Sequence, residues 1–316
     1  MKRKILFGII SLLIAILLLF IYIAVGRKNL ILPKEYVNEK YKFSNSNFIQ
    51  WRGAELHYTE SGSGMPILMI HGFGGSNRDF LLLDSLINDK YKVIRVDMPG
   101  FGLSDFPIQQ NPNIDYIKVY NDYFEFMLTT LHIDSCYVMG NSLGGLMAWN
   151  LALNKPNTVK KLILFNSAGY DMTEVMKTAN VTIFRNPLVQ VLIKRGIPLF
   201  MSKDGLNRVL YNKTLVTKDR IQTVNDLWNR AGNLQQIMNM ASSNNYPDWE
   251  KIKNISCPTL IVWGRQDEII NPKYAAQFHK DIKQSHVIMY DSCGHVPMLE
   301  KPNLVKRDVL SFLQNN

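Results

Sequence analysis

Residues 137–145 read YVMGNSLGG, with a β-branched and aromatic stretch before Ser142 and a helix-forming stretch after it. A strand-to-helix turn this tight forces the serine backbone into a strained φ/ψ region and leaves no room for neighbouring side chains. Gly140 and Gly144 are therefore required on steric grounds. The turn lifts the Ser142 hydroxyl clear of its neighbours, and a helix over 143–154 directs its N-terminal amides at the same point. The pattern predicts an exposed nucleophile.

Two further polar residues follow predicted strands later in the chain. Asp267 comes after an apolar strand at 259–264, and His295 comes after a strand at 286–290, each in a glycine-bearing loop. The carboxyl ends of parallel strands lie at one edge of a sheet, and the order Ser, Asp, His at strand ends is the order expected of α/β-hydrolases. The three residues are thus predicted to form one site.

Five ordered motifs carry a wider resemblance. They are HGFGG at 71–75, DMPGFGLS at 97–104, the turn around Ser142, WGRQD at 263–267 and CGH at 293–295. From about residue 50 onward the chain resembles the α/β-hydrolase-fold family, in its group of single-cap esterases, monoacylglycerol lipase-like enzymes and C–C bond hydrolases. The related haloalkane dehalogenases and epoxide hydrolases carry an aspartate where this chain has Ser142, so their chemistry is excluded.

The chemistry of each candidate residue follows from its type. Ser142 needs a base, and the His295 imidazole titrates near neutral pH, so it can accept the serine proton and return it to a leaving group. Asp267 is expected to hold the imidazole tautomer and to stabilise the imidazolium, with the adjacent Glu268 as its rival. The backbone amides of Phe73 and Leu143 are the expected oxyanion donors.

Strands and helices alternate along most of the chain. Predicted strands lie at 55–59, 67–70, 92–97, 136–139, 161–165, 259–264 and 286–290, and predicted helices lie at 80–86, 115–131, 143–154 and 274–282. Several of the strands are continuous apolar runs, which is typical of a sheet covered on both faces. The expected fold class is α/β, with a mostly parallel sheet between helices.

The alternation is interrupted between two halves of the catalytic domain, 49–169 and 253–316. Residues 170–252 show helical patterns separated by proline-containing breaks and include no strand candidate. The related enzymes carry a helical cap at this place. We therefore expect 170–252 to form a cap over the site, with most of its Met and Leu side chains packed within the cap and the remainder facing the substrate.

The amino terminus reads as a membrane anchor. Residues 5–25 carry no charge, and 21 helical residues span about 31 Å, the thickness of a bilayer core. A cleaved signal peptide, which would make the enzyme secreted, is the alternative, but its apolar region would be unusually long. We favour an uncleaved anchor over 1–28, a juxtamembrane linker over 29–48, and a catalytic domain on the non-cytoplasmic side.

Composition excludes several other classes. The net charge is +10, but five of the basic residues flank the apolar segment, where they suit topology and anionic lipid. The other basic residues are interspersed with acids, and no nucleic-acid motif is present. No nucleotide loop or His/Cys cluster is present, so neither cofactor nor metal is expected. The three cysteines are expected to be buried apolar residues, with a reactive thiol at Cys293 as the alternative.

The sequence thus predicts a membrane-anchored serine hydrolase that cleaves carboxylic esters through an acyl-enzyme. The anchor, the Met- and Leu-rich cap and the resemblance of residues 293–302 to membrane-bound monoacylglycerol lipases favour monoacylglycerols or related lipid esters. A C–C bond hydrolase of the meta-cleavage type is the alternative, although those enzymes commonly carry tryptophan directly after the catalytic histidine, where this chain has Val296. A non-catalytic binding protein of the same fold is the third hypothesis, but such proteins usually lack a triad member.

Overall fold

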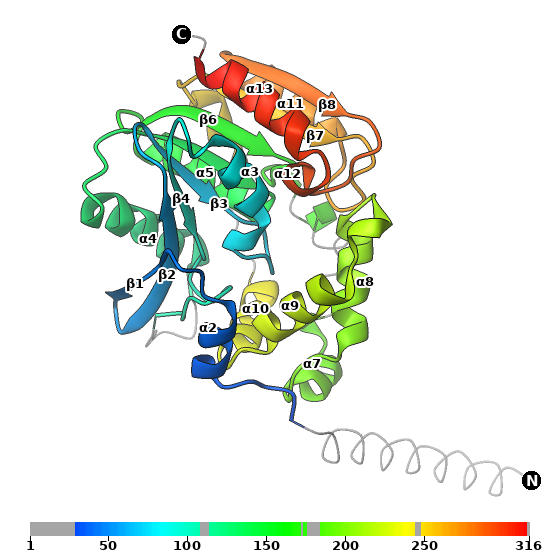
Figure 1. Ribbon diagram of the computed structural model, residues 1–316. Helices are drawn as coiled ribbons and strands as arrows, with labels where there is room; N and C mark the ends of the chain where they lie inside the picture. The colour runs from blue at the N-terminus through cyan, green and yellow to red at the C-terminus, as the bar shows by residue number, and fades with distance from the viewer. Residues whose placement is uncertain (1–28, 108–113, 172, 176–183, 244–247, 315–316) are drawn as a thin grey trace, which may run out of the picture.

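The computed structural model describes residues 29–107, 114–171, 173–175, 184–243 and 248–314. Its centre is an eight-stranded sheet with the strand order β1-β2-β4-β3-β5-β6-β7-β8 (Figure 1). The pairs β1/β2 and β2/β4 are antiparallel, and every other pair is parallel. The strands are β1 (Ser46–Trp51), β2 (Ala54–Ser61), β3 (Pro66–Ile70), β4 (Lys92–Val96), β5 (Cys136–Asn141), β6 (Val159–Phe165), β7 (Thr259–Gly264) and β8 (Ser285–Tyr290).

Helices cover both faces of this sheet, as its continuous apolar strands require. One face carries α4 (Tyr116–Thr130), α5 (Leu143–Asn154) and α11 (Lys273–Asp281), and the other carries α3 (Leu81–Ile87), α12 (Pro297–Glu300) and α13 (Pro302–Gln314). Successive residues of β5 point to opposite faces: Val138 joins the first core and Met139 the second. The mostly parallel α/β fold predicted from the sequence is therefore confirmed.

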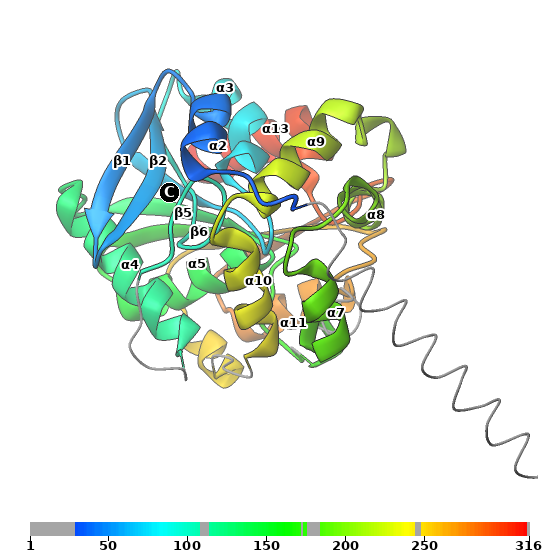
Figure 2. The same cartoon turned by 90° about the horizontal axis from the view of Figure 1, so that it is seen from below.

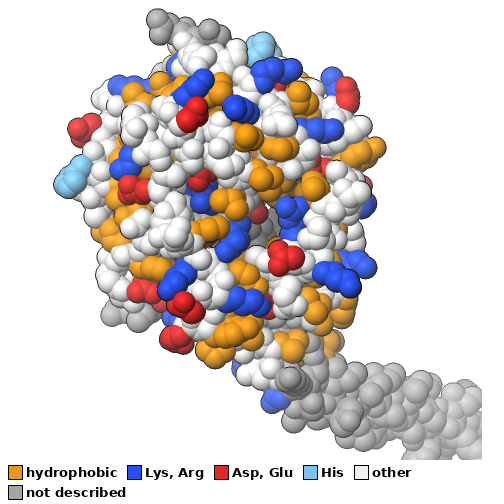
Figure 3. Space-filling view, viewed as in Figure 1, with side chains coloured by type: hydrophobic (Ala, Val, Ile, Leu, Met, Phe, Trp, Pro, Cys, Tyr) orange, Lys and Arg blue, Asp and Glu red, His pale blue; other side chains and the backbone are white. Residues whose placement is uncertain are grey.

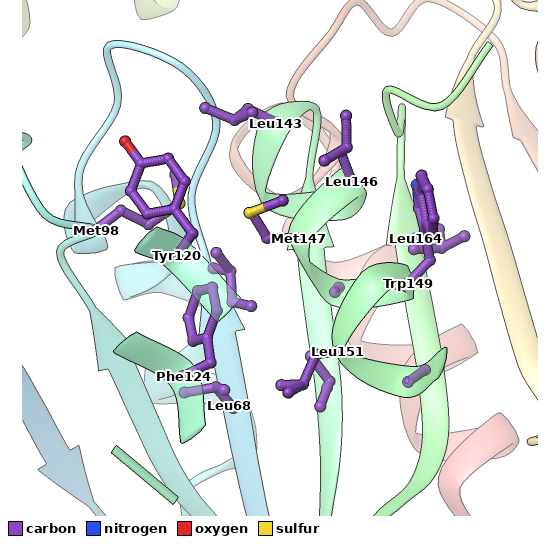
Figure 4. Close-up of a cluster of buried hydrophobic side chains, with 14 of the residues drawn as sticks. Leu68, Met98, Tyr120, Phe124, Leu143, Leu146, Met147, Trp149, Leu151 and Leu164 are labelled. Atoms are coloured by element: carbon purple, nitrogen blue, oxygen red, sulfur yellow. The ribbon is translucent and has the colours of Figure 1, made fainter. Parts of the chain in front are cut away.

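The larger core lies between the sheet and the pair α4 and α5. Figure 4 shows Tyr120 and Phe124 of α4 facing Met147 of α5 above Leu68 of β3. All four side chains are buried, and Tyr120 and Phe124 follow the three- and four-residue steps predicted for the helix over 115–131. Their packing fixes α5, and with it the position of Ser142 directly before its first turn.

Four helices gather beside the sheet in both Figure 1 and Figure 2: α7 (Pro187–Ile193), α8 (Leu199–Val209), α9 (Lys218–Asn229) and α10 (Asn233–Ser242). Helix α7 begins at the proline of the predicted Asn186-Pro187 break, and α8 begins directly after Pro198. The described residues between 170 and 252 belong to no strand of the sheet. We call these four helices the cap.

The segment predicted as a linker, 29–48, is folded instead. It contains α2 (Lys34–Tyr41) and the start of β1, and the backbone of Leu32 bonds to Asn229 and Ala231 of the cap. The physical reason lies in α2, where Val37 and Tyr41 are one turn apart and both buried against the rest of the protein. A linker would leave this apolar pair exposed to water.

The predicted membrane anchor at 1–28 lies outside the described residues. Among the helices of the described ranges, none combines the length and the apolar character needed to cross a bilayer.

Candidate active site

Ser142 occupies a strained turn between β5 and α5. Its φ is +55° and its ψ is −117°, a backbone conformation that side-chain-bearing residues rarely adopt. A Cβ on Gly140 would collide with the carbonyl of Gly144, and a Cβ on Gly144 would collide with the carbonyl of Ile70. The two glycines are thus sterically required, as the motif predicted.

Asp267 and His295 are hydrogen-bonded to each other. His295 Nδ1 lies 2.8 Å from Asp267 Oδ2, and both side chains are buried. The other carboxylate oxygen of Asp267 accepts hydrogen bonds from the amides of Ile269 and Ile270, at 2.8 and 3.1 Å. The neighbouring Glu268 is exposed. The structure therefore pairs Asp267, and not its rival, with the histidine.

Two asparagines, neither of which was predicted to have a role, hold this pair in place. The buried Asn166 follows β6 and donates from Nδ2 to Asp267 Oδ2 at 2.6 Å. Asn141, which precedes Ser142, donates from Nδ2 to the carbonyl of His295 at 2.9 Å. Asn141 was visible as part of the motif, and Asn166 was visible as a polar residue at a strand end. The first contact joins the neighbouring ends of β6 and β7, and the second joins the end of β5 to the loop after β8. The network therefore spans β5, β6, β7 and the loop after β8.

The predicted oxyanion donors lie on either side of Ser142. Leu143 is the first residue of α5, and Phe73 belongs to the loop after β3, which passes so close that a Cβ on Gly72 would lie 3.1 Å from the Ser142 Cβ. Within the described part of the chain, neither the Phe73 nor the Leu143 amide donates to another residue. Both amides are thus available to a ligand at the site.

His71 braces the loop that carries Phe73. Its Nε2 accepts a hydrogen bond from the Met98 amide at 3.0 Å, so Nδ1 carries the proton and donates to the Gly72 carbonyl at 2.7 Å. Complete burial lowers the pKa of His71, which keeps the ring neutral. Asp97 at the start of the neighbouring turn accepts from the amides of Asn77 and Leu103. These residues support the rim of the site and have no direct part in the proposed reaction.

A cavity of about 1330 Å³ opens above the site, between the sheet and the cap, and it is lined by both Ser142 and His295. Most of its wall is apolar and comes from the cap and α5, including Leu146, Val189, Met201 and Met240. The cap also contacts the loop around Phe73 directly, because Trp228 Nε1 donates to the Gly74 carbonyl at 2.7 Å. Figure 3 shows a hollow near the centre of this face of the molecule.

The alternative of a reactive thiol at Cys293 does not agree with its surroundings. The residue is fully buried, and burial raises the pKa of its thiol to about 12, so the thiolate is disfavoured at neutral pH. In the described ranges, moreover, no three His, Cys, Asp or Glu side chains cluster as they would around a metal ion.

Residues 65–302 match the family described as the alpha/beta hydrolase fold. The chain belongs to this family. Among its curated relatives, Lipase 1 of Psychrobacter immobilis is 31% identical over 267 residues, which are 78% of this chain and 77% of the relative. A 2-hydroxy-6-oxononadienedioate/2-hydroxy-6-oxononatrienedioate hydrolase of Burkholderia vietnamiensis is 28% identical over 83% of this chain and 92% of its own length.

Solved structures agree on the fold. A meta-cleavage product hydrolase superposes with a TM-score of 0.73 at 23% identity, over 84% of this chain and 97% of that one. The family predicted from the five motifs is thus confirmed. Its relatives include both lipases and C–C bond hydrolases, the two groups that the sequence resembles.

Proposed function

We propose that this α/β hydrolase cleaves carboxylic esters, with Ser142 as nucleophile, His295 as general base and Asp267 as the residue that orients the histidine. The observation that carries the proposal is the hydrogen bond between Asp267 and His295 in the wall of the cavity that Ser142 also lines. A carboxylate on Nδ1 leaves Nε2 as the nitrogen that can accept the serine proton.

In the proposed mechanism the Ser142 hydroxyl attacks the ester carbonyl while His295 takes its proton. The negative charge that develops on the carbonyl oxygen is met by the amides of Phe73 and Leu143, which have no acceptor within the described part of the chain. His295 then protonates the departing alcohol, and an acyl group remains on Ser142. Water activated by the same histidine hydrolyses this acyl-enzyme.

We further propose that the acyl chain is apolar and that the substrates are monoacylglycerols or related lipid esters. The cavity supports this choice, because its volume of about 1330 Å³ exceeds the roughly 300–1,000 Å³ of common small-molecule pockets and its wall is mostly apolar. The similarity to Lipase 1 at 31% identity supports it as well. The anchor at 1–28 completes the proposal, with the catalytic domain on the non-cytoplasmic side of the membrane.

A C–C bond hydrolase is the second candidate, favoured by the similarity to the hydrolase of Burkholderia vietnamiensis. The position after His295 weighs against it, because the tryptophan common in such enzymes is replaced by Val296. A non-catalytic binding protein is less well supported, since Ser142, Asp267 and His295 are all present.

A fluorophosphonate probe tests the nucleophile. It should label Ser142, and Ser142→Ala should lose both labelling and turnover, by on the order of 10⁴–10⁶ in rate. Labelling of a different serine contradicts the mechanism.

Assays of acyl esters beside a meta-cleavage dienoate separate the two enzyme classes. Faster cleavage of the dienoate supports the C–C bond hydrolase. Retention in the membrane pellet after an alkaline carbonate wash tests the anchor, and a mature protein that starts near Arg27 would show a cleaved signal.

A further inference from the structure

One part of the cavity wall is charged rather than apolar. Charged side chains reach it from the short helix η1 (Asn77–Phe80) and from the cap helices α8 and α9. Figure 3 shows Lys and Arg side chains around the hollow on this face. The charged residues that line the cavity are Arg78, Asp79, Lys203, Asp204, Arg208, Asp219 and Arg220. An apolar acyl chain gains no favourable contact from charged side chains, so the proposed acyl group does not account for them.

Arg78 is held in place by the last residue of α2 and by the segment that follows it. Its guanidinium stacks on Phe43, 4.2 Å from the ring centroid, and on Tyr41, and it donates to the Tyr41 carbonyl. A guanidinium has five N–H donors, and in the described ranges the Tyr41 carbonyl is the acceptor of one of them. Desolvation lowers the pKa of Arg78, which means that burial of the charged guanidinium at the cavity wall costs free energy.

Arg220 faces the same space from the first turns of α9. Its Nη1 donates to the Leu215 carbonyl at 2.8 Å, which fixes the side chain but does not neutralise it. Among the described residues neither Arg78 nor Arg220 forms an ion pair. Arg230, directly after the end of α9, is different, because it pairs with Asp105 at 3.0 Å.

The acids that line this part of the cavity form no ion pair with the two arginines among the described residues. Asp79 lines the cavity beside Arg78, and burial raises the pKa of its carboxyl to about 7, so a large share of it is neutral at physiological pH. Asp219 is exposed to solvent. Asp97 and Asp219 attract Arg78, and Asp79 attracts Arg220, but none of these acids is in ion-pair contact with either arginine. An anionic ligand in the cavity would therefore give the two arginines the direct partner that the described residues do not supply.

We infer that Arg78 and Arg220 bind an oxyanion carried by the substrate, so that the preferred esters are amphiphiles with an anionic head group. The inference rests on the proposed ester hydrolysis and adds the chemistry of the head group. Arginine suits this role, because its planar fork donates two parallel hydrogen bonds to a phosphate or a carboxylate. The apolar wall then takes the acyl chain, and Ser142 lines the same cavity.

Three octanoyl esters that differ only in their head group test the inference: octanoylglycerol, octanoylglycerol phosphate and octanoyl glycerate. The full-length protein should have a higher kcat/KM for a charged ester than for the neutral one. The favoured charged ester identifies the head group, phosphate or carboxylate. Arg220→Gln should lower kcat/KM for that ester about tenfold and change the value for octanoylglycerol less than twofold.

Two variants act as controls. Arg220→Lys keeps the charge and should restore part of the loss, while Lys218→Gln removes an exposed charge two residues away that does not line the cavity. The Lys218 variant should leave all three values unchanged. An equal loss on the neutral and charged esters in Arg220→Gln would overturn the inference, because Arg220 would then serve the structure alone.

Binding measured without turnover separates this inference from the proposed function. Octyl phosphate should bind more tightly than the octyl ether of glycerol in calorimetric titrations, and Arg220→Gln should remove the difference. If the wild-type protein cleaves none of the esters but keeps this preference, the proposed function fails and the oxyanion site stands. If octyl phosphate and octyl succinate both bind no better than the neutral ether, the oxyanion site fails whatever the turnover.

Discussion

Trp228 of the cap helix α9 donates from its indole Nε1 to the carbonyl of Gly74, over 2.7 Å. Gly74 is next to Phe73, whose amide is a proposed oxyanion donor. The contact also requires a glycine, since φ is +71° there and a Cβ would collide with the indole ring. This hydrogen bond couples the cap to the loop beside the nucleophile. A change in the cap is therefore expected to alter the rate of the proposed reaction.

Trp228→Phe tests this coupling. Phenylalanine keeps an aromatic ring against Gly74 but removes the donor, so the loop loses one hydrogen bond worth about 1 kcal/mol. We expect kcat to fall about fivefold, because the Phe73 amide is held less firmly where the oxyanion forms. Steady-state kinetics on a soluble ester measures the change. Trp249→Phe, at an exposed tryptophan outside the cavity, is the control. Wild-type kcat in Trp228→Phe would show that the contact has no part in catalysis.

Asp267→Asn and Glu268→Gln form a second matched pair. The asparagine amide would favour the wrong tautomer of His295, so kcat should drop by roughly 10³–10⁴ with little change in fold. Glu268 is exposed, and the carboxylate that bonds His295 Nδ1 is that of Asp267, so the Glu268 variant should retain nearly full activity. Circular dichroism checks that both variants fold. A large loss in Glu268→Gln with an active Asp267→Asn would reverse the proposed roles.

Local patterns were sufficient to predict most of the sheet. The strand at β5 and the helix at α5 follow from one continuous apolar run, two obligatory glycines and a change of period, all within 20 residues. The edge strand β1 was not predicted, because its burial pattern lacks a clear alternation and its pairing depends on the tight turn at Arg52 and Gly53, both with positive φ. The helix α2 was missed for a related reason, since its two buried side chains pack against Leu103 and Leu227, which lie far along the chain in the turn after β4 and in the cap helix α9.

The candidate active site, like the fold, was predicted from the sequence only in part. The sequence placed Ser142, Asp267 and His295 together because parallel strands end at one edge, and the structure brings Asp267 and His295 into a hydrogen bond. Their catalytic roles remain predictions. The hydrogen bonds of Asn166 and Trp228 were not predicted, because their partners are 101 and 154 residues away along the chain and no local spacing indicates such contacts. The charged part of the cavity was missed because it is assembled from separate helices.

Asp79 makes stability depend on pH. Burial raises the pKa of its carboxyl from 3.8 to about 7, so the folded protein holds this proton more tightly than the unfolded chain does. The resulting contribution to stability is fully present below pH 3.8 and is lost as the pH rises to about 7. Asp79→Asn removes the titration, so its Tm relative to wild type should be about 2 °C or more higher at pH 8 than at pH 4.

The comparison of two Tm differences cancels other titrating groups, which both proteins share. Asp89→Asn, at an exposed position after α3, controls for the loss of one negative charge. Its Tm difference from wild type should be the same at both pH values. A pH-independent difference for Asp79→Asn as well would show that its carboxyl is ionised in the fold at little cost.

The length of the acyl chain tests what the apolar wall of the cavity selects. Each added CH₂ that leaves water for that wall contributes up to about 0.8 kcal/mol, or roughly fourfold in kcat/KM. Activity should therefore rise from acetyl toward medium-chain esters with the same alcohol. Only contacts made in the transition state raise kcat/KM in this way, so a steep slope indicates a fitted channel rather than simple partitioning. All substrates should stay below their critical micelle concentrations, where aggregation cannot imitate the effect.

A variant with a narrower cavity, Leu146→Trp, should prefer shorter acyl chains, because Leu146 lines the wall beside Ser142. A flat profile or a preference for acetyl esters would contradict the lipid substrates, and efficient cleavage of a meta-cleavage dienoate under the same conditions would favour the C–C hydrolase instead.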